Sequence, residues 1–146
     1  MRLTAISSVV LAAVVVLVTA ATAATGGTVV SWRKTSIGNA ITNSAGHTLY
    51  LFRADHGTTS TCYGQCAVYW PPLLTSGKPT ASGRVMGSLL GTTKRKDGKL
   101  QVTYKGHPLY TYLMDKKAGQ TAGEGSKFFG AAWYALAPSG ATIDKD

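Results

Sequence analysis

The sequence predicts an all-β protein, an antiparallel sandwich or small barrel, built from two tandem repeats. A ten-residue pattern at 46–55 returns 60 residues later at 106–115, with Gly, His, Leu, Tyr and Asp in register. Each half also carries a Trp followed by a Ser-Gly pair, Trp70 in the first and Trp133 in the second. Beyond residue 23, no stretch keeps the apolar period of a helix. Short strand patterns instead alternate with turn residues about every eight to twelve positions, as in antiparallel β-domains.

Residues 1–23 have the pattern of a secretory signal peptide and are predicted to form a signal helix ahead of the β-domain. A short basic start precedes an uncharged run of Val, Ala and Leu, and Ala21-Thr22-Ala23 fits the small-residue cleavage rule. We therefore expect cleavage after Ala23 and a secreted or extracytoplasmic protein. If the segment is not cleaved, its roughly 20 apolar residues are long enough to anchor the chain in a membrane.

The first half of the domain is expected to hold two core strands and a cysteine-bearing loop. A lead segment, 24–36, includes a short strand over 29–34, and the two-repeat domain covers 37–146. Repeat 1 spans about 37–77, with strands over 37–42 and 47–53 joined by a turn at 43–46. Leu49 and Leu51 face one way and Tyr50 and Phe52 the other, so the second strand should be covered on both sides. Two prolines keep residues 70–74 extended.

A polar link at 78–83 leads into repeat 2, which spans about 84–140. Within it, Asp97-Gly98 predicts a two-residue type I′ hairpin turn, and Lys105-Gly106 predicts a second tight turn. The Gly-rich stretch 118–126 is expected to be a loop. Strands are predicted over 84–93, 100–104, 109–114, 128–137 and 141–143.

Two Tyr-x-(Phe/Trp/Tyr)-x-x-Asp elements, at 50–55 and 110–115, resemble the signature of a bacterial family of secreted repeats of unknown function, described as predicted lipoproteins. The Cys-x-Gly-x-Cys loop followed by Trp-Pro-Pro-Leu resembles the family's first repeat, and the run over 97–110 resembles its second. The resemblance implies exported, repeat-built domains without an established activity. This chain has no cysteine at the predicted cleavage site, so the lipid-modified cysteine of a lipoprotein is absent there.

The repeated aromatic and acidic residues are expected to serve the fold. The aromatic side chains are predicted to form core, with a ligand groove as the alternative. Asp55 and Asp115 could pair for acid–base work or for Ca²⁺. Their duplication favours turn capping over a catalytic role, because a repeated position usually supports the repeat itself. The residues given this structural role are Tyr50, Phe52, Asp55, Tyr110, Tyr112, Asp115, Trp70 and Trp133.

The chain is strongly basic, with a formal net charge of +9 that falls to +8 when Arg2 is removed with the signal peptide. Such a surface attracts anionic cell-wall polymers or a membrane surface; the alternative is a set of solvated hairpin tips. Nucleic acid is not expected, because no recognition helix and no aromatic residues interleaved with basic ones occur. The predicted anion-binding residues are Lys94, Arg95, Lys96 and Lys99.

Cys62 and Cys66 are the chain's two cysteines, and in an exported protein a pair this close should be oxidised. We predict a structural disulfide whose small loop contributes only about 2 kcal/mol on the chain-entropy model. The alternative is a redox-active or metal-binding dithiol. The spacing is not Cys-x-x-Cys, and a second cysteine pair that would complete a zinc site is missing.

His47 and His107 occupy equivalent positions in the two repeats, so the fold could bring them together. With Met86 or Met114 they would make a ligand set for copper or haem. The alternative is that each imidazole makes local hydrogen bonds at its turn, and this alternative is favoured because the pair lacks metal-ligand spacing. The favoured interpretation therefore includes no cofactor.

The sequence thus favours an exported, non-catalytic binding or structural module of the cell envelope that contacts anionic polymers. The second interpretation is a redox or metal/haem-binding accessory protein that uses His47 and His107. The third is a cell-wall hydrolase, for which the sequence offers neither an unpaired acid–base pair nor a Gly-x-Ser-x-Gly element. The ligand and the oligomeric state are not predicted.

Overall fold

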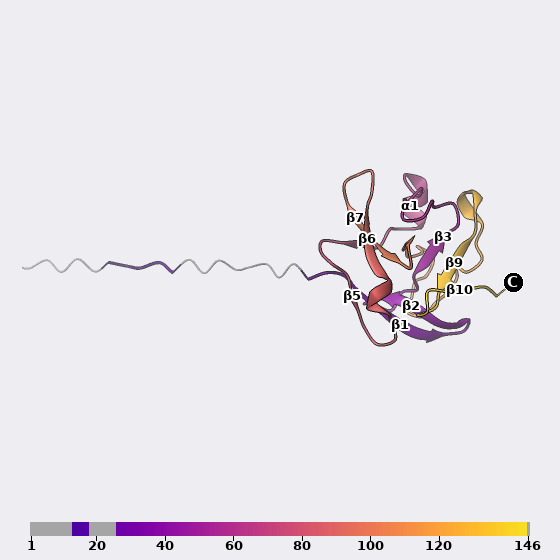
Figure 1. The fold of residues 1–146 in the computed structure, drawn as a ribbon, viewed down its shortest axis with the longest axis horizontal. Coiled ribbons are helices and arrows are strands. Elements are labelled where there is room, and N and C mark those ends of the chain that lie inside the picture. Colours follow the sequence, from indigo (N-terminus) through magenta and orange to yellow (C-terminus); the bar gives the residue numbers. More distant parts are fainter. Residues whose placement is uncertain (1–12, 18–25, 146) are drawn as a thin grey trace, which may run out of the picture.

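The structure is a computed structural model that describes residues 13–17 and 26–145. The described domain consists mainly of short strands in antiparallel sheets, so the all-β prediction is confirmed (Figure 1). The predicted signal helix lies outside the described residues except for 13–17, which form neither helix nor strand. Among the described residues, no helix is long and apolar enough to cross a membrane.

The first sheet has the order β2-β1-β5. Strand β1 (Val29–Thr35) pairs antiparallel with β2 (Gly38–Asn43) over a full hairpin. Strand β5 (Thr80–Ala81) runs parallel to β1, so this sheet is not purely antiparallel as predicted. The predicted polar link folds back along β1 because its backbone finds hydrogen-bond partners there: Thr80 N donates to Thr28 O and Ser82 N to Val30 O.

A second sheet holds β4 (Leu74–Thr75), β7 (Leu100–Tyr104) and β6 (Leu90–Lys94) in that order, with β8 (His107–Pro108) also paired to β7. The type I′ prediction for Asp97-Gly98 is wrong, because only Gly98 has a positive φ, 83°. The loop is closed by Arg95 N donating to Lys99 O and Gly98 N donating to Arg95 O. A type I′ turn needs positive φ at both central residues. Lys105 and Gly106 meet that condition, with φ of 48° and 78°.

The third sheet joins the two repeats. Strand β9 (Trp133–Leu136) lies between β10 (Thr142–Ile143) and β3 (Tyr50–Phe52), and the last of these comes from repeat 1. The equivalent pairing, in which the second motif lies against the proline-containing segment of repeat 1, is weaker. Thr111 N donates to Pro71 O over 2.9 Å and Leu113 N to Tyr69 O over 2.8 Å, but the strand predicted over 109–114 does not form. Pro71 and Pro72 lack the N–H groups that would continue the ladder.

Three short helical turns were not predicted. They are α1 (Gln65–Tyr69), η1 (Gly87–Leu89) and η2 (Phe128–Gly130), each of five residues or fewer. Elements this short show no apolar period in the sequence. The turns η1 and η2 shorten the strands predicted over 84–93 and 128–137, which begin only at Leu90 and Trp133.

The core has two parts on opposite faces of β3, as the alternation of that strand predicted. Leu49 and Leu51 pack into an aliphatic cluster with residues of both hairpins. Tyr50 and Phe52 pack into an aromatic cluster that also contains the cysteines. The aromatic cluster consists of Tyr50, Phe52, Cys62, Cys66, Trp70, Tyr110, Trp133 and Ala135.

Candidate functional site

The two repeats meet at Tyr50 and Tyr110, which hydrogen-bond reciprocally through their backbones over 2.8 and 3.0 Å. Their side chains also cross between repeats. The Tyr50 hydroxyl donates to Asp115 Oδ2 over 2.6 Å, and the Tyr110 hydroxyl donates to Asp55 Oδ2 over 2.8 Å. Each motif therefore supplies a tyrosine to the aspartate of the other motif.

Four aromatic side chains, two from each repeat, form one continuous stack. Phe52 stacks on Trp133 at 4.0 Å, Trp133 on Trp70 at 3.9 Å, and Trp70 on Tyr112 at 4.0 Å between ring centroids. Residues of repeat 1 and repeat 2 alternate along it. Phe52 and both tryptophans are buried, whereas Tyr112 at the other end is half-buried. This part of the predicted core therefore ends at the protein surface.

The two aspartates hold turns as well as tyrosines. Asp55 Oδ1 accepts the Thr61 N–H, and Asp115 Oδ1 accepts the Ala122 N–H, each over 2.8 Å. Burial raises the pKa of both carboxyl groups above the usual range, while these hydrogen bonds act in the opposite direction. Both carboxylates are thus engaged within the fold.

The tyrosine hydroxyls of this network are held in their neutral form. Burial, assisted by the hydrogen bond to Asp115, raises the pKa of Tyr50 well above its ordinary value. Burial likewise raises the pKa of Tyr110, whose hydroxyl also lies 2.7 Å from Ser60 Oγ. A phenol that keeps its proton can go on donating to its carboxylate partner.

The four residues of the predicted anion-binding site differ in burial, with one arginine buried and three lysines exposed. Arg95 is only 4% exposed, and its guanidinium donates to Ser60 Oγ, Gln101 Oε1 and the Cys62 carbonyl. The expectation that Arg95 presents its charge to an anion at the surface is therefore wrong, because the side chain turns inward to these acceptors. The other three members, Lys94, Lys96 and Lys99, are exposed around the β6–β7 hairpin.

His47 and His107 are half-buried, and each interacts electrostatically with the aspartate of the opposite repeat. His47 lowers the pKa of Asp115 electrostatically, and Asp55 acts to raise the pKa of His107. Burial first, and then the charge of Arg53, lower the pKa of His107. Within the described residues, no three His, Cys, Asp or Glu side chains lie close enough to hold a metal ion. The proposed methionine ligands, Met86 and Met114, are about half exposed.

Cys62 and Cys66 form a disulfide in the structure. Cys62 lies in the aromatic cluster and Cys66 in α1, so the bond attaches the helix to the core. Tyr69 is the last residue of this helix. The disulfide thereby fixes the element that carries one wall of the hollow described next.

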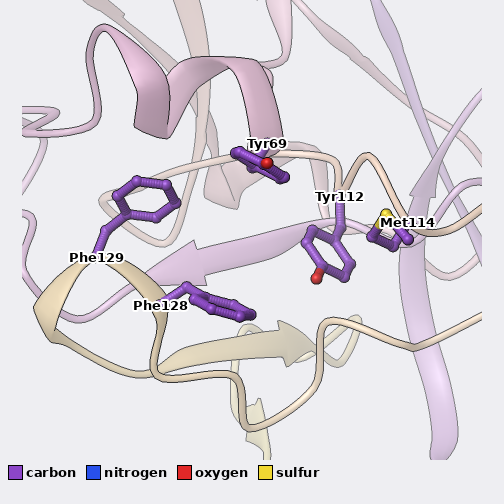
Figure 2. Close-up of a pocket in the computed structure, with 5 residues that line it drawn as sticks. All are labelled: Tyr69, Tyr112, Met114, Phe128 and Phe129. Carbon is purple, nitrogen blue, oxygen red and sulfur yellow. The ribbon is translucent and has the colours of Figure 1, made fainter.

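An apolar hollow of about 440 Å³ opens where the aromatic stack reaches the surface. Figure 2 shows the rings of Tyr69 and Phe128 on opposite sides, with Phe129 at one end and Tyr112 and Met114 at the other. Phe128 is 64% exposed and Phe129 42%. A neighbouring hollow of about 490 Å³ shares Tyr112 and Phe128 and adds Ala122, Ser126 and Lys127.

The η2 turn presents both phenylalanines at a conformational cost. Phe129 has φ 66° and ψ 28°, the left-handed region that bulky residues avoid by roughly 1–2 kcal/mol. The Trp133 indole donates to the Phe128 carbonyl over 2.9 Å and so fixes the turn to the stack. A strained backbone at an exposed, aromatic-lined hollow is a feature typical of binding sites.

Sequence reasoning missed this hollow because residues 128–137 were assigned to one strand. Of its lining, it singled out Tyr112 as core and Met114 as a possible metal ligand, and it gave Tyr69, Phe128 and Phe129 no role in a site. The adjacent pair Phe128-Phe129 was the available signal, since neighbouring side chains on a strand face opposite ways and cannot both enter one core.

Comparison with known families gives one match. A family model described as a secreted repeat of unknown function matches residues 31–74 and 91–137. The two matched segments fall in the two halves of the domain that exchange tyrosines and aspartates. No curated protein and no solved structure matches the chain.

Proposed function

Because the chain belongs to the family of secreted repeats of unknown function, we propose that it is an exported, non-catalytic binding module of the cell envelope whose binding site is the aromatic hollow. The family description supports an extracytoplasmic location. The net charge of +9 supports an anionic partner. The hollow is formed by Tyr69, Tyr112, Met114, Phe128 and Phe129.

The observation that carries this proposal is the exposure of large aromatic rings around an open hollow (Figure 2). Burying the exposed part of Phe128 alone is worth about 1–2 kcal/mol of binding free energy. The hollow is also preorganised, because Tyr112 stacks on Trp70 and the Phe128 carbonyl is held by Trp133. Preorganised walls lose little conformational entropy when a ligand enters.

The chemistry of the lining supports binding rather than catalysis. None of the five lining side chains is a carboxylate, a histidine or a cysteine. The nearby carboxylate of Asp115 is buried and accepts hydrogen bonds from Tyr50 and from the Ala122 N–H. Apart from Tyr69 and Tyr112, the lining offers no side chain of the kinds used in general acid–base catalysis.

The test is a titration of the exported protein with a neutral aromatic probe, N-phenyl-1-naphthylamine, followed by fluorescence. We expect saturable binding that is weakened at least tenfold in Phe128→Ser. Met86→Ser is the matched control, because Met86 is 48% exposed but does not line the hollow. No binding by the unaltered protein, or equal binding by both variants, would contradict the proposal.

A further inference from the structure

Six exposed large apolar side chains either line the hollow or directly neighbour its lining residues in the chain, and we call this set the apolar face. Leu113 N donates to Tyr69 O over 2.8 Å, and the rings of Tyr69 and Phe129 lie 6.1 Å apart, so its three segments adjoin. In Figure 1, α1 and the η2 turn lie at the same end of the domain. Each of the six is at least two-fifths exposed: Val68, Tyr69, Leu113, Met114, Phe128 and Phe129.

Three exposed lysines border the apolar face. Lys127 lines the neighbouring hollow and directly precedes Phe128, while Lys116 and Lys117 follow Met114 closely in the chain. The backbone N–H groups of Lys116 and Lys117 donate to Gln120 Oε1, which holds their turn in shape. The three lysines therefore lie close in the chain to residues that line the hollow, and the turn that carries two of them is held in shape.

The acidic groups within the same stretch of chain are directed inward. Asp115 is only 3% exposed and accepts the Tyr50 hydroxyl, and Glu124 accepts the Ala135 N–H over 2.7 Å. The rim of the apolar face thus presents lysines while its carboxylates face the protein. This arrangement is complementary to a surface that is apolar inside and negative outside.

We propose that the apolar face docks on an anionic lipid bilayer, with Phe128 and Phe129 at the boundary of headgroups and acyl chains and the three lysines on anionic headgroups. The inference rests on the proposed function, because the hollow lies at the centre of the face. Exposed apolar side chains flanked by lysines are the pattern of interfacial membrane binding. A hydrophilic anionic polymer would neutralise the lysines but leave Phe128 in water.

The experiment measures binding of the exported protein to vesicles of phosphatidylcholine with and without phosphatidylglycerol. We expect binding only when phosphatidylglycerol is present, weakening as salt rises because the charge interaction is screened. Each lysine near an anionic surface contributes about fivefold in affinity. The variant K116Q/K117Q/K127Q should therefore bind about a hundredfold more weakly.

The β6–β7 hairpin offers a matched control with the same change of charge. K94Q/K96Q/K99Q removes three exposed lysines that line neither of the two hollows and should bind within about threefold of the unaltered protein. Phe128→Ser should weaken vesicle binding at least tenfold, and Phe128→Trp should give indole fluorescence quenched by brominated acyl chains. All variants carry the same N-terminus, so any contribution of residues 1–23 is common to them.

Three results would overturn the inference. They are absence of binding to anionic vesicles, an equal loss in the two triple-lysine variants, and unchanged vesicle binding by Phe128→Ser. Binding to a soluble polyanion that is as tight as binding to vesicles and indifferent to Phe128→Ser would favour a polymer instead. If the neutral probe still binds without vesicles, only the membrane inference fails; if the probe also fails to bind, the proposed function fails with it.

Discussion

The Tyr50 hydroxyl donates a 2.6 Å hydrogen bond to Asp115, a residue 65 positions away in the other repeat. The equivalent bond joins Tyr110 to Asp55. The tyrosine of each motif is therefore hydrogen-bonded to the aspartate of the other motif. In the fold, the tyrosine of each repeat finds its acceptor in the other repeat, so the exchange ties the two repeats into one unit.

Removing one tyrosine hydroxyl from the hydrogen bonds between the repeats should destabilise the whole domain. Tyr50→Phe leaves the buried Asp115 carboxyl without its side-chain donor, and the free energy of unfolding should fall by about 1–3 kcal/mol. Urea denaturation measures the change. Tyr112→Phe is the control, since its half-buried ring lines the hollow, and it should change stability by less than about 0.5 kcal/mol. A Tyr50→Phe variant as stable as this control would show that the bond is dispensable.

The same phenols give the domain a specific weakness at high pH. Burial raises the pKa of Tyr50 and Tyr110 above the ordinary value of about 10, so the unfolded chain releases these protons first. The stability that these raised pKa values give the folded state is fully present below pH 10. It is lost as the pH rises above that value. The loss should be about 1.4 kcal/mol per pH unit for each tyrosine. Unfolding free energies from pH 9 to 11 for the unaltered protein and for Y50F/Y110F measure it, because other titrating groups cancel in the difference. Parallel curves would contradict the expectation.

The repeat, the fold class and the alternating faces of β3 could all be predicted, because they follow from local patterns such as the period of two along residues 49–52. The exchange between repeats could not. Nothing in a local pattern specifies whether Tyr50 binds Asp55 of its own motif or Asp115 of the other. The basic run shows the same limit. Nothing in Lys94-Arg95-Lys96 specifies that Arg95 turns inward, because its buried acceptors Ser60, Gln101 and Cys62 O are brought to it by tertiary structure.

One glycine should be intolerant of even a methyl group. A Cβ on Gly123 would lie 2.7 Å from Trp70 Cη2 and 3.0 Å from Tyr50 Cζ. Trp70 is held between Trp133 and Tyr112 and cannot move away. Gly123→Ala should therefore lower stability by about 1–3 kcal/mol, the usual consequence of overpacking a core. Thermal unfolding tests this.

The matched control for Gly123→Ala is Gly87→Ala, where the nearest atom to the new methyl is Ala81 Cβ at 3.8 Å. This variant should unfold within about 0.5 kcal/mol of the unaltered protein, since the contact is an ordinary one. Equal stability of the two alanine variants would mean that the stack can shift to admit the methyl group.

Loss of the disulfide should affect the hollow as well as stability. In C62A/C66A the chain-entropy contribution of the small loop, about 2 kcal/mol, is lost. Release of α1 from the aromatic cluster should also free Tyr69, so binding of N-phenyl-1-naphthylamine should weaken several-fold. Denaturant unfolding and probe titration measure the two effects. Reductant should reproduce both in the unaltered protein and neither in the variant; full probe binding by C62A/C66A would separate the disulfide from the site.

Phe129→Gly should separate binding from stability. Glycine adopts φ 66° without steric penalty, which recovers roughly 1–2 kcal/mol, but it adds backbone entropy to the unfolded chain and removes a partly buried ring. These terms oppose one another, so the free energy of unfolding should change by no more than about 1 kcal/mol. Probe binding should still weaken at least fivefold, because one wall of the hollow is gone. A variant that binds the probe as well as the unaltered protein would mean that the strained Phe129 serves no binding role, whereas a large loss of stability would mean that its ring is needed for the fold.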